Sequence, residues 1–279
     1  MNSPTAWLKF GLFSVGLGQS FAFVLVPPLA RDLGLSVIET SSIFSISAIA
    51  WAITSASWGR ASDKYGRRNI AMIGLIGYSI SIIALITPLF LVEKNILDFV
   101  YLLPLLVLGR LINGLIGSAT RPAAFAYMAD ISDRSKRTKK FARLESSFLV
   151  GTIMGPMIGG FLFLYSKTLP FYIFALCGGI AAIGILITFP KNIEQKSSNT
   201  IKSNLSFRDS SIWPFLAVAS LFSLCQASLL QSIGFFVTDT FFYEKDLPLV
   251  ISLTFVVLSI STVVSQYIFT DLKPITNNK

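Results

Sequence analysis

Residues 59–69 read GRASDKYGRRN, and this short stretch separates two long apolar segments of the chain. Five charged side chains lie between Arg60 and Arg68, although the 279-residue chain is 53% hydrophobic and only 13% charged. Soluble globular domains carry about 25% charged residues. The charges gather in connectors while the segments around them are apolar, which predicts a protein embedded in a membrane.

The same stretch contains residues suited to a turn and to an ion pair. Gly59 and Gly66 allow a tight reversal of the backbone, through positive dihedral angles or close approach. Asp63 lies four residues before Arg67, within reach of its guanidinium. The alternative interpretation is a solvated loop whose basic residues only follow membrane topology.

Working outward, the chain contains apolar segments of the length that a membrane-spanning helix needs, about 20 residues. Helix is expected because a lipid-exposed backbone must satisfy its own hydrogen bonds. Eight segments qualify: 6–28, 40–58, 70–92, 98–129, 143–165, 169–190, 212–238 and 247–270. The fold class predicted is therefore an all-α membrane protein.

The one long polar stretch, residues 191–211, divides these segments into six before it and two after it. It is rich in Ser, Asn and Lys, as flexible linkers are. We therefore expect a six-helix unit over 1–190, a linker over 191–211 and a two-helix unit over 212–279.

The basic residues predict the orientation of these helices. Of the 23 Lys and Arg residues, 17 fall in one set of alternating connectors and the two tails, four fall in the other set, and Arg110 and Arg121 fall inside the fourth segment. The positive-inside rule then places both termini in the cytoplasm.

Other classes of function are excluded by the same residues. Nucleic-acid binding is rejected because the basic residues behind the net charge of +9 lie in short connectors between spans. The chain has no His, no nucleophile–base pair and no phosphate-binding loop, and Cys177 and Cys225 have no metal or redox spacing. We therefore expect neither an enzyme nor a metal or cofactor site.

Four motifs, in order, resemble those of the major facilitator superfamily of transporters. The loop pattern G-x-x-x-D-K-x-G-R-R is followed by LVLGRLINGLIGS at 106–118, AYMADISDRSKR at 126–137 and GTIMGPMIGG at 151–160. Asn113 stands where Gln is usual and Ile116 where a small residue is usual. The last motif is similar to that of the drug–proton antiporter branch.

This resemblance implies the major facilitator fold, with a complete N-terminal six-helix bundle and the first two helices of the C-terminal bundle. Complete relatives have four more helices, so we expect a chain that is truncated after its eighth helix. Internal repeats of six helices underlie alternating access in such transporters. A monomer in a lipid bilayer is expected.

Arg110 is the sharpest candidate for the substrate cavity, because a charge inside a span costs at least about 2.5 kcal/mol. Arg121 follows eleven residues later, about 20° away around a helix axis and about 16 Å along it. Snorkelling to the headgroups is the alternative for Arg121. The resemblance adds cavity walls from the first, fourth and seventh helices, and the expected residues are Gln19, Arg110, Asn113, Arg121 and Gln226. A plain helix–helix hydrogen bond is the alternative for each glutamine.

The other motif residues are expected at a gate and at a helix contact. The resemblance implies a cytoplasmic gate in which Asp130 pairs with the loop arginines, and its residues are Gly59, Asp63, Lys64, Gly66, Arg67, Arg68 and Asp130. Glycines every four residues let a neighbouring helix approach closely, and Pro156 removes a backbone donor. The resemblance implies that this stripe packs on the eighth helix, near Ser261 and Ser265; its residues are Gly151, Gly155, Pro156, Gly159 and Gly160.

The function implied is export of small organic molecules, drugs or secreted metabolites such as siderophores, by exchange with protons across a bacterial inner membrane. Import of a metabolite by the same fold and an inactive truncated fragment are the alternatives. Asp32, Asp98 and Glu145 fall near segment ends. The sequence therefore offers no mid-span carboxylate for the proton.

Overall fold

The computed structural model describes residues 3–133, 137–189 and 213–240, together with residues 250, 253, 254, 257, 260 and 261. These residues form helices joined by short turns, with no strand among them. The main helices are α1 (Pro4–Asp32), α2 (Val37–Tyr65), α3 (Arg67–Glu93), α4 (Leu102–Leu115), α5 (Thr120–Asp130), α6 (Arg137–Phe163), α7 (Leu169–Thr188) and α8 (Trp213–Thr240). Two 3₁₀ turns, η1 (Phe99–Tyr101) and η2 (Gly117–Ala119), flank α4.

Within the described ranges, six helical stretches are long and apolar enough to cross a membrane. They correspond to the first six predicted segments, so the all-α membrane fold is confirmed. The fourth stretch, Phe99–Asp130, is composed of η1, α4, η2 and α5. Helix α8 covers the seventh predicted segment, whereas the linker 191–211 and most of 247–270 lie outside the described residues. The division into two units stays a prediction.

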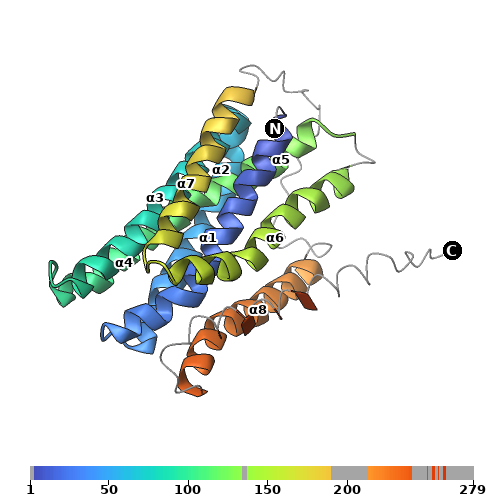
Figure 1. Cartoon of the computed structure of the whole chain (residues 1–279). Coiled ribbons are helices and arrows are strands. Elements are labelled where there is room, and N and C mark those ends of the chain that lie inside the picture. The colour runs from blue at the N-terminus through green and yellow to red at the C-terminus, as the bar shows by residue number, and fades with distance from the viewer. Residues whose placement is uncertain are drawn as a thin grey trace.

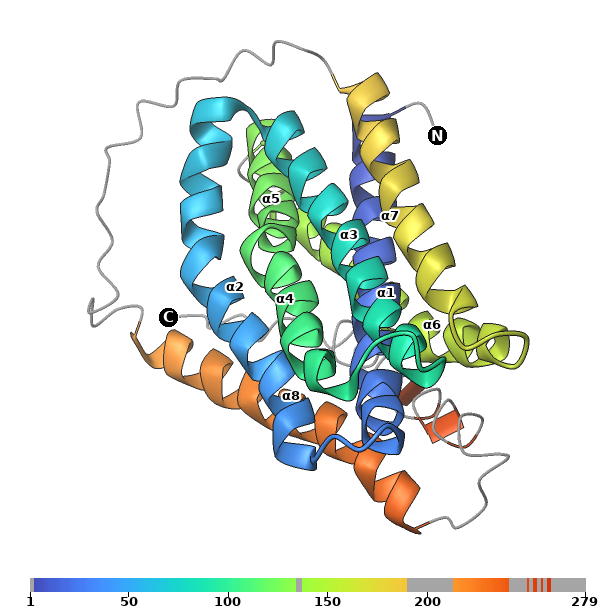
Figure 2. The same cartoon turned by 90° about the vertical axis from the view of Figure 1, so that its left-hand side faces the viewer.

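Helix α1 is the centre of the six-span bundle (Figures 1 and 2). Its most apolar window is 78% buried, and it packs against α6 on one side and α7 on the other. Phe21 of α1 makes edge contacts with Phe171 and Phe174 of α7. Helix α3 packs against α4 and α7, and α2 packs against α4. Helix α8 lies outside this bundle, crosses it obliquely in Figure 2 and contacts α1.

Helices α1 and α6 meet through glycines at backbone distance. A Cβ atom at Gly151 would lie 2.1 Å from the carbonyl oxygen of Phe13, and one at Gly155 would lie 2.3 Å from that of Leu17. Gly16 of α1 faces α6 in the same way, 2.3 Å from the carbonyl oxygen of Phe148. In the described part of the chain, Gly151 and Gly155 therefore pack on α1. The expected partner of the stripe, the eighth predicted segment with Ser261 and Ser265, lies mostly outside the described residues, so that contact stays a prediction.

The turn between α2 and α3 is a single residue. Gly66 has a φ of 90°, which glycine adopts at little steric cost, so its predicted role is confirmed. Gly59 instead lies inside α2, where the nearest atom to an added Cβ is 4.0 Å away. A turn or close-approach role for Gly59 is therefore wrong, because the helix continues through most of the charged stretch.

The fourth span is interrupted at η2, and side chains of α2 satisfy the carbonyls near the interruption. Thr54 Oγ1 donates to the carbonyl of Gly114 at 2.9 Å, and Trp58 Nε1 donates to that of Leu115 at 2.6 Å. A Cβ at Gly117 would lie 2.5 Å from Asn113 Oδ1, which favours glycine at this bend. The hydrogen bonds from α2 fix how α5 continues from α4.

Candidate functional site

Two cavities that share lining residues lie along α1 and hold most of the candidate residues. The first, here the arginine cavity, has a volume of about 220 Å³ and is lined by residues of α1, α2, α4 and α5. The second, here the carboxylate cavity, has a volume of about 420 Å³ and is lined by α1, α5, α6 and α8. Gln19, Phe23 and Arg121 line both of them.

Arg110 enters the arginine cavity from α4 and is only 3% exposed. Its guanidinium carbon lies 5.0 Å from the ring centre of Phe44 and 5.6 Å from that of Phe23. Its Nε is buried and has no hydrogen-bond partner among the described residues. Cation–π contacts supply some attraction, but a buried cation without a carboxylate is costly.

Arg121 enters both cavities from the first turn of α5 and forms an ion pair with Glu145 of α6. Its guanidinium also lies over the Phe148 ring, 4.6 Å from the centroid. The side chains of Arg121 and Glu145 are 33% and 32% exposed, so solvent reaches the pair. The second carboxylate oxygen of Glu145, Oε2, is buried and makes no hydrogen bond to any described residue.

Sequence reasoning placed Glu145 near a helix end and so missed this pair. Helix α6 begins at Arg137, eight residues earlier, which places Glu145 about 12 Å along the helix. The sequence contained one local signal, a seven-residue spacing that places Glu145 and Thr152 on the same face of a helix. In the structure both residues line the carboxylate cavity.

The structure brings four of the five predicted cavity residues together. Gln19, Arg110, Asn113 and Arg121 all line the arginine cavity. Helical spacing indicated the three residues of the fourth span, and the resemblance indicated Gln19. The ion pair of Arg121 favours its cavity interpretation over snorkelling. Gln226 lies in α8, but its side chain is outside the described residues. The substrate role of these residues stays a prediction.

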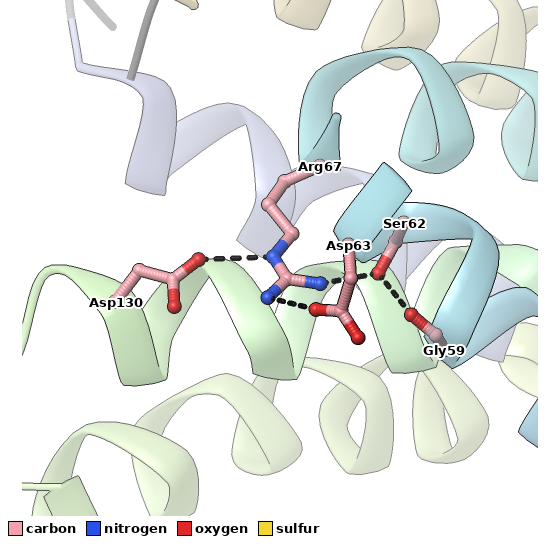
Figure 3. Close-up of polar contacts among 5 residues, drawn as sticks. All are labelled: Gly59, Ser62, Asp63, Arg67 and Asp130. Atoms are coloured by element: carbon pink, nitrogen blue, oxygen red, sulfur yellow. Dashed lines mark hydrogen bonds and ion pairs between the residues drawn. The ribbon is translucent and has the colours of Figure 1, made fainter. Parts of the chain in front are cut away.

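A second group, here the Arg67 cluster, lies at the α2–α3 turn (Figure 3). Arg67 of α3 contacts Asp63 of α2 at 2.5 Å, and its Nε donates to Asp130 of α5 at 2.9 Å. Its Nη1 donates to Ser62 Oγ at 2.6 Å, and Ser62 donates to the Gly59 carbonyl at 2.8 Å. The predicted contacts of Arg67 with Asp63 and with Asp130 are confirmed.

The remaining basic residues of the loop motif have separate surroundings. Arg68 donates to the carbonyl of Leu186 near the C-terminal end of α7, where a cation is favoured by the helix dipole. Lys64 lies over the ring of its neighbour Tyr65, 5.1 Å from the centroid. Neither residue joins the Arg67 cluster through any contact that the structure shows. In the described ranges, no group of three or more acidic or Cys side chains is placed to hold a metal ion.

Comparison with known proteins agrees with the helices and motifs. Residues 8–277 match the model of the Major Facilitator Superfamily. The quinolone resistance protein NorA of Staphylococcus aureus (strain Mu50 / ATCC 700699) is 31% identical over 193 residues, which are 68% of this chain and 47% of that protein. The class B tetracycline resistance protein of Escherichia coli is 28% identical over 217 residues, which are 76% of this chain and 51% of that protein. The chain thus spans about half the length of the curated relatives it matches.

Proposed function

Because this chain belongs to the Major Facilitator Superfamily, a family of membrane transporters and not of enzymes, we propose that it exports small organic molecules in exchange for protons. Export proceeds by alternating access, in which a central site opens to one side of the membrane and then to the other. The relatives are named for resistance to quinolone and tetracycline. Drug-like molecules or secreted metabolites of similar size are therefore the substrate class that we propose.

The observation that carries this proposal is the pair of polar cavities within an apolar bundle. Ionisable side chains inside a span are costly and mark pathways for substrates and ions. Here Arg110, Arg121 and Glu145 line cavities that also present the aromatic rings of Phe23 and Phe148. Aromatic walls with a few convergent polar groups are typical of sites for small organic ligands.

The Arg67 cluster is proposed as part of the gate on the cytoplasmic side. It joins α2, α3 and α5 through one guanidinium, so these helix ends separate only if the ion pairs break. This assignment places both termini in the cytoplasm, as the positive-inside rule predicts. Reporter fusions after residues 195 and 279 test it, and a periplasmic signal at residue 195 would overturn the orientation.

Efflux of ethidium tests the transport function. Bacteria that lack their own drug pumps are loaded with ethidium and expected to lose it faster when they express the chain, with the gain abolished by a protonophore. Gly179→Ala is a matched control, because a Cβ there meets no atom within 4 Å. Protonophore-resistant efflux would contradict proton exchange, and accumulation of the dye would indicate import.

A further inference from the structure

The arginine cavity carries a positive charge that the described side chains around it do not neutralise. We propose that this cavity binds aromatic carboxylates, planar organic acids whose carboxylate contacts the guanidinium of Arg110. This inference rests on the proposed function above and deepens it by naming a class of substrate. Its starting point is the lining of the cavity, which includes Arg110 and Arg121 and, among the described residues, neither Asp nor Glu.

The charges of the two cavity arginines are matched to different degrees. Arg121 forms an ion pair with Glu145, which lines the adjoining carboxylate cavity. Arg110 is only 3% exposed and forms no ion pair with any described residue, and its buried Nε has no hydrogen-bond partner among them. A buried cation is costly unless an anion pairs with it. The cavity is therefore suited to a ligand with a single negative charge.

The polar groups of the cavity suit a carboxylate. A guanidinium presents its N–H donors in a planar fork that matches the two oxygens of a carboxylate. The amide groups of Gln19 and Asn113 line the same cavity, and each has N–H donors for such an oxygen. Ser47 of α2 donates to the backbone carbonyl of Arg110 at 2.8 Å. This bond ties α2 to α4 at the residue from which the guanidinium extends.

The apolar walls of the cavity suit an aromatic ring. Phe23, Phe44 and Trp51 line it. The rings of Phe23 and Phe44 stack on each other with their centroids 4.7 Å apart, and the guanidinium of Arg110 lies over both. Aromatic rings attract each other by more than the burial of their area. The volume of about 220 Å³ is below the range from about 300 Å³ that drug-sized ligands occupy, so one ring or two fused rings are expected there.

The neighbouring carboxylate cavity determines the direction in which a larger acid lies. Glu145 would repel a second carboxylate there, since like charges close together are unfavourable. Gln19, Phe23 and Arg121 line both cavities, which places the two side by side. A longer substrate can therefore hold its acid beside Arg110 and extend its remaining body into the larger cavity.

A matched set of naphthalene compounds tests the charge preference of the purified 279-residue chain in detergent. 2-Naphthoate carries the carboxylate, 2-naphthamide has nearly the same shape without the charge, and 2-naphthylmethylammonium carries the opposite charge. Each is titrated into the protein near neutral pH, and its binding is measured by isothermal titration calorimetry. For the wild type we expect 2-naphthoate to bind at least about tenfold more tightly than 2-naphthamide, because a charge-assisted pair with Arg110 is added. The ammonium compound should bind more weakly than the amide.

Three variants separate the pairing with Arg110 from general effects of charge and fold. R110M should bind 2-naphthoate and 2-naphthamide with affinities within about twofold of each other, because the fork is removed and an apolar side chain remains. R60M is the matched control: it removes the same charge from an arginine whose printed contact is an exposed hydrogen bond to Ser57, and should keep the wild-type preference. Ala48 is an exposed residue that lines the arginine cavity, so A48F should weaken both ligands without altering any charge.

The outcomes distinguish this inference from the proposed function. Equal binding of 2-naphthoate and 2-naphthamide by the wild type, or a wild-type preference in R110M, would overturn the carboxylate site and leave the export proposal standing. Selective binding that R110M abolishes, in a chain that exports no ethidium, would support the site and overturn export. If R110M lost the helical circular dichroism of the wild type, A48F would decide, and unchanged binding of 2-naphthoate by A48F would show that the acid binds elsewhere.

Discussion

The Arg67 cluster and the cavity arginines differ in how fully their charges are matched. Arg67 is 13% exposed at its side chain and contacts two carboxylates and a hydroxyl. In the cavities, Arg121 pairs with Glu145, whereas Arg110 lies near the rings of Phe23 and Phe44 and forms no ion pair with any described residue. The first group is electrostatically satisfied, and the second carries a surplus of positive charge.

This difference assigns different roles to the two groups. A satisfied polar network rigidifies the structure around it, whereas a partly satisfied one is costly to keep buried. Costly intramembrane charges mark functional sites. We therefore expect substitutions in the Arg67 cluster to act mainly on stability, and substitutions of the cavity arginines to act mainly on transport.

Replacing Arg110 should have the largest effect and should act on transport alone. Arg110→Met keeps much of the apolar volume and removes a buried cation that pairs with no carboxylate among the described residues, a change that is often neutral or stabilising. We expect ethidium efflux to fall more than tenfold while the unfolding temperature in detergent stays equal or rises. Arg110→Lys keeps the charge but loses the planar guanidinium, and should recover little activity. If Arg110→Met unfolded at a lower temperature and kept the same efflux per molecule, Arg110 would have a structural role and not one in transport.

Replacing Arg67 should show the opposite pattern. Arg67→Ala leaves Asp63 and Asp130 facing each other without their shared cation, and breaking a buried pair costs about 3 to 5 kcal/mol. Asp63 is 63% exposed, so we expect a smaller loss, about 2 to 3 kcal/mol, seen as an unfolding temperature lower by several degrees. Arg60→Ala is the control, because the contact that the described residues offer Arg60 is an exposed hydrogen bond to Ser57. An equal fall in unfolding temperature in Arg67→Ala and Arg60→Ala would show that the Arg67 cluster contributes no more to stability than an exposed arginine does.

Much of the fold could be predicted from sequence because its determinants are local. The apolar length of each span, the surplus of basic residues in alternate connectors and the burial of Arg110 all follow from neighbouring residues. The contact between Asp63 and Arg67 was predictable for the same reason, since the two residues are four positions apart. These features depend on no distant partner.

The features that sequence missed depend on partners far along the chain. Glu145 of α6 pairs with Arg121 of α5, which lies 24 residues earlier in the chain. Hydropathy predicted that α6 starts at residue 143 and not at Arg137, because the first turns of the helix are polar. The bend at η2 depends on Thr54 and Trp58 of α2, about 60 residues earlier. The glycine stripe on α6 could not by itself indicate which helix packs against it.

The smallest effect is expected at Asp63, and it tests whether the Arg67 cluster is as well satisfied as the distances indicate. Asp63 is 63% exposed and Asp130 is 27% exposed, and both contact the same guanidinium. Exposed ion pairs contribute about 0 to 1 kcal/mol, and an asparagine at position 63 can still accept a hydrogen bond from Arg67. Asp63→Asn should therefore lower the unfolding temperature by less than Asp130→Asn does. It should leave ethidium efflux within about twofold of the wild type, because Arg67 still pairs with Asp130 in this variant. Thermal unfolding and ethidium efflux, measured side by side for the two variants, test this prediction.

One outcome would contradict it: Asp63→Asn loses as much efflux as Arg110→Met and keeps the stability of the wild type. The exposed carboxylate of Asp63 would then take part in transport itself. The division into a stabilising group of arginines and a functional one would not hold.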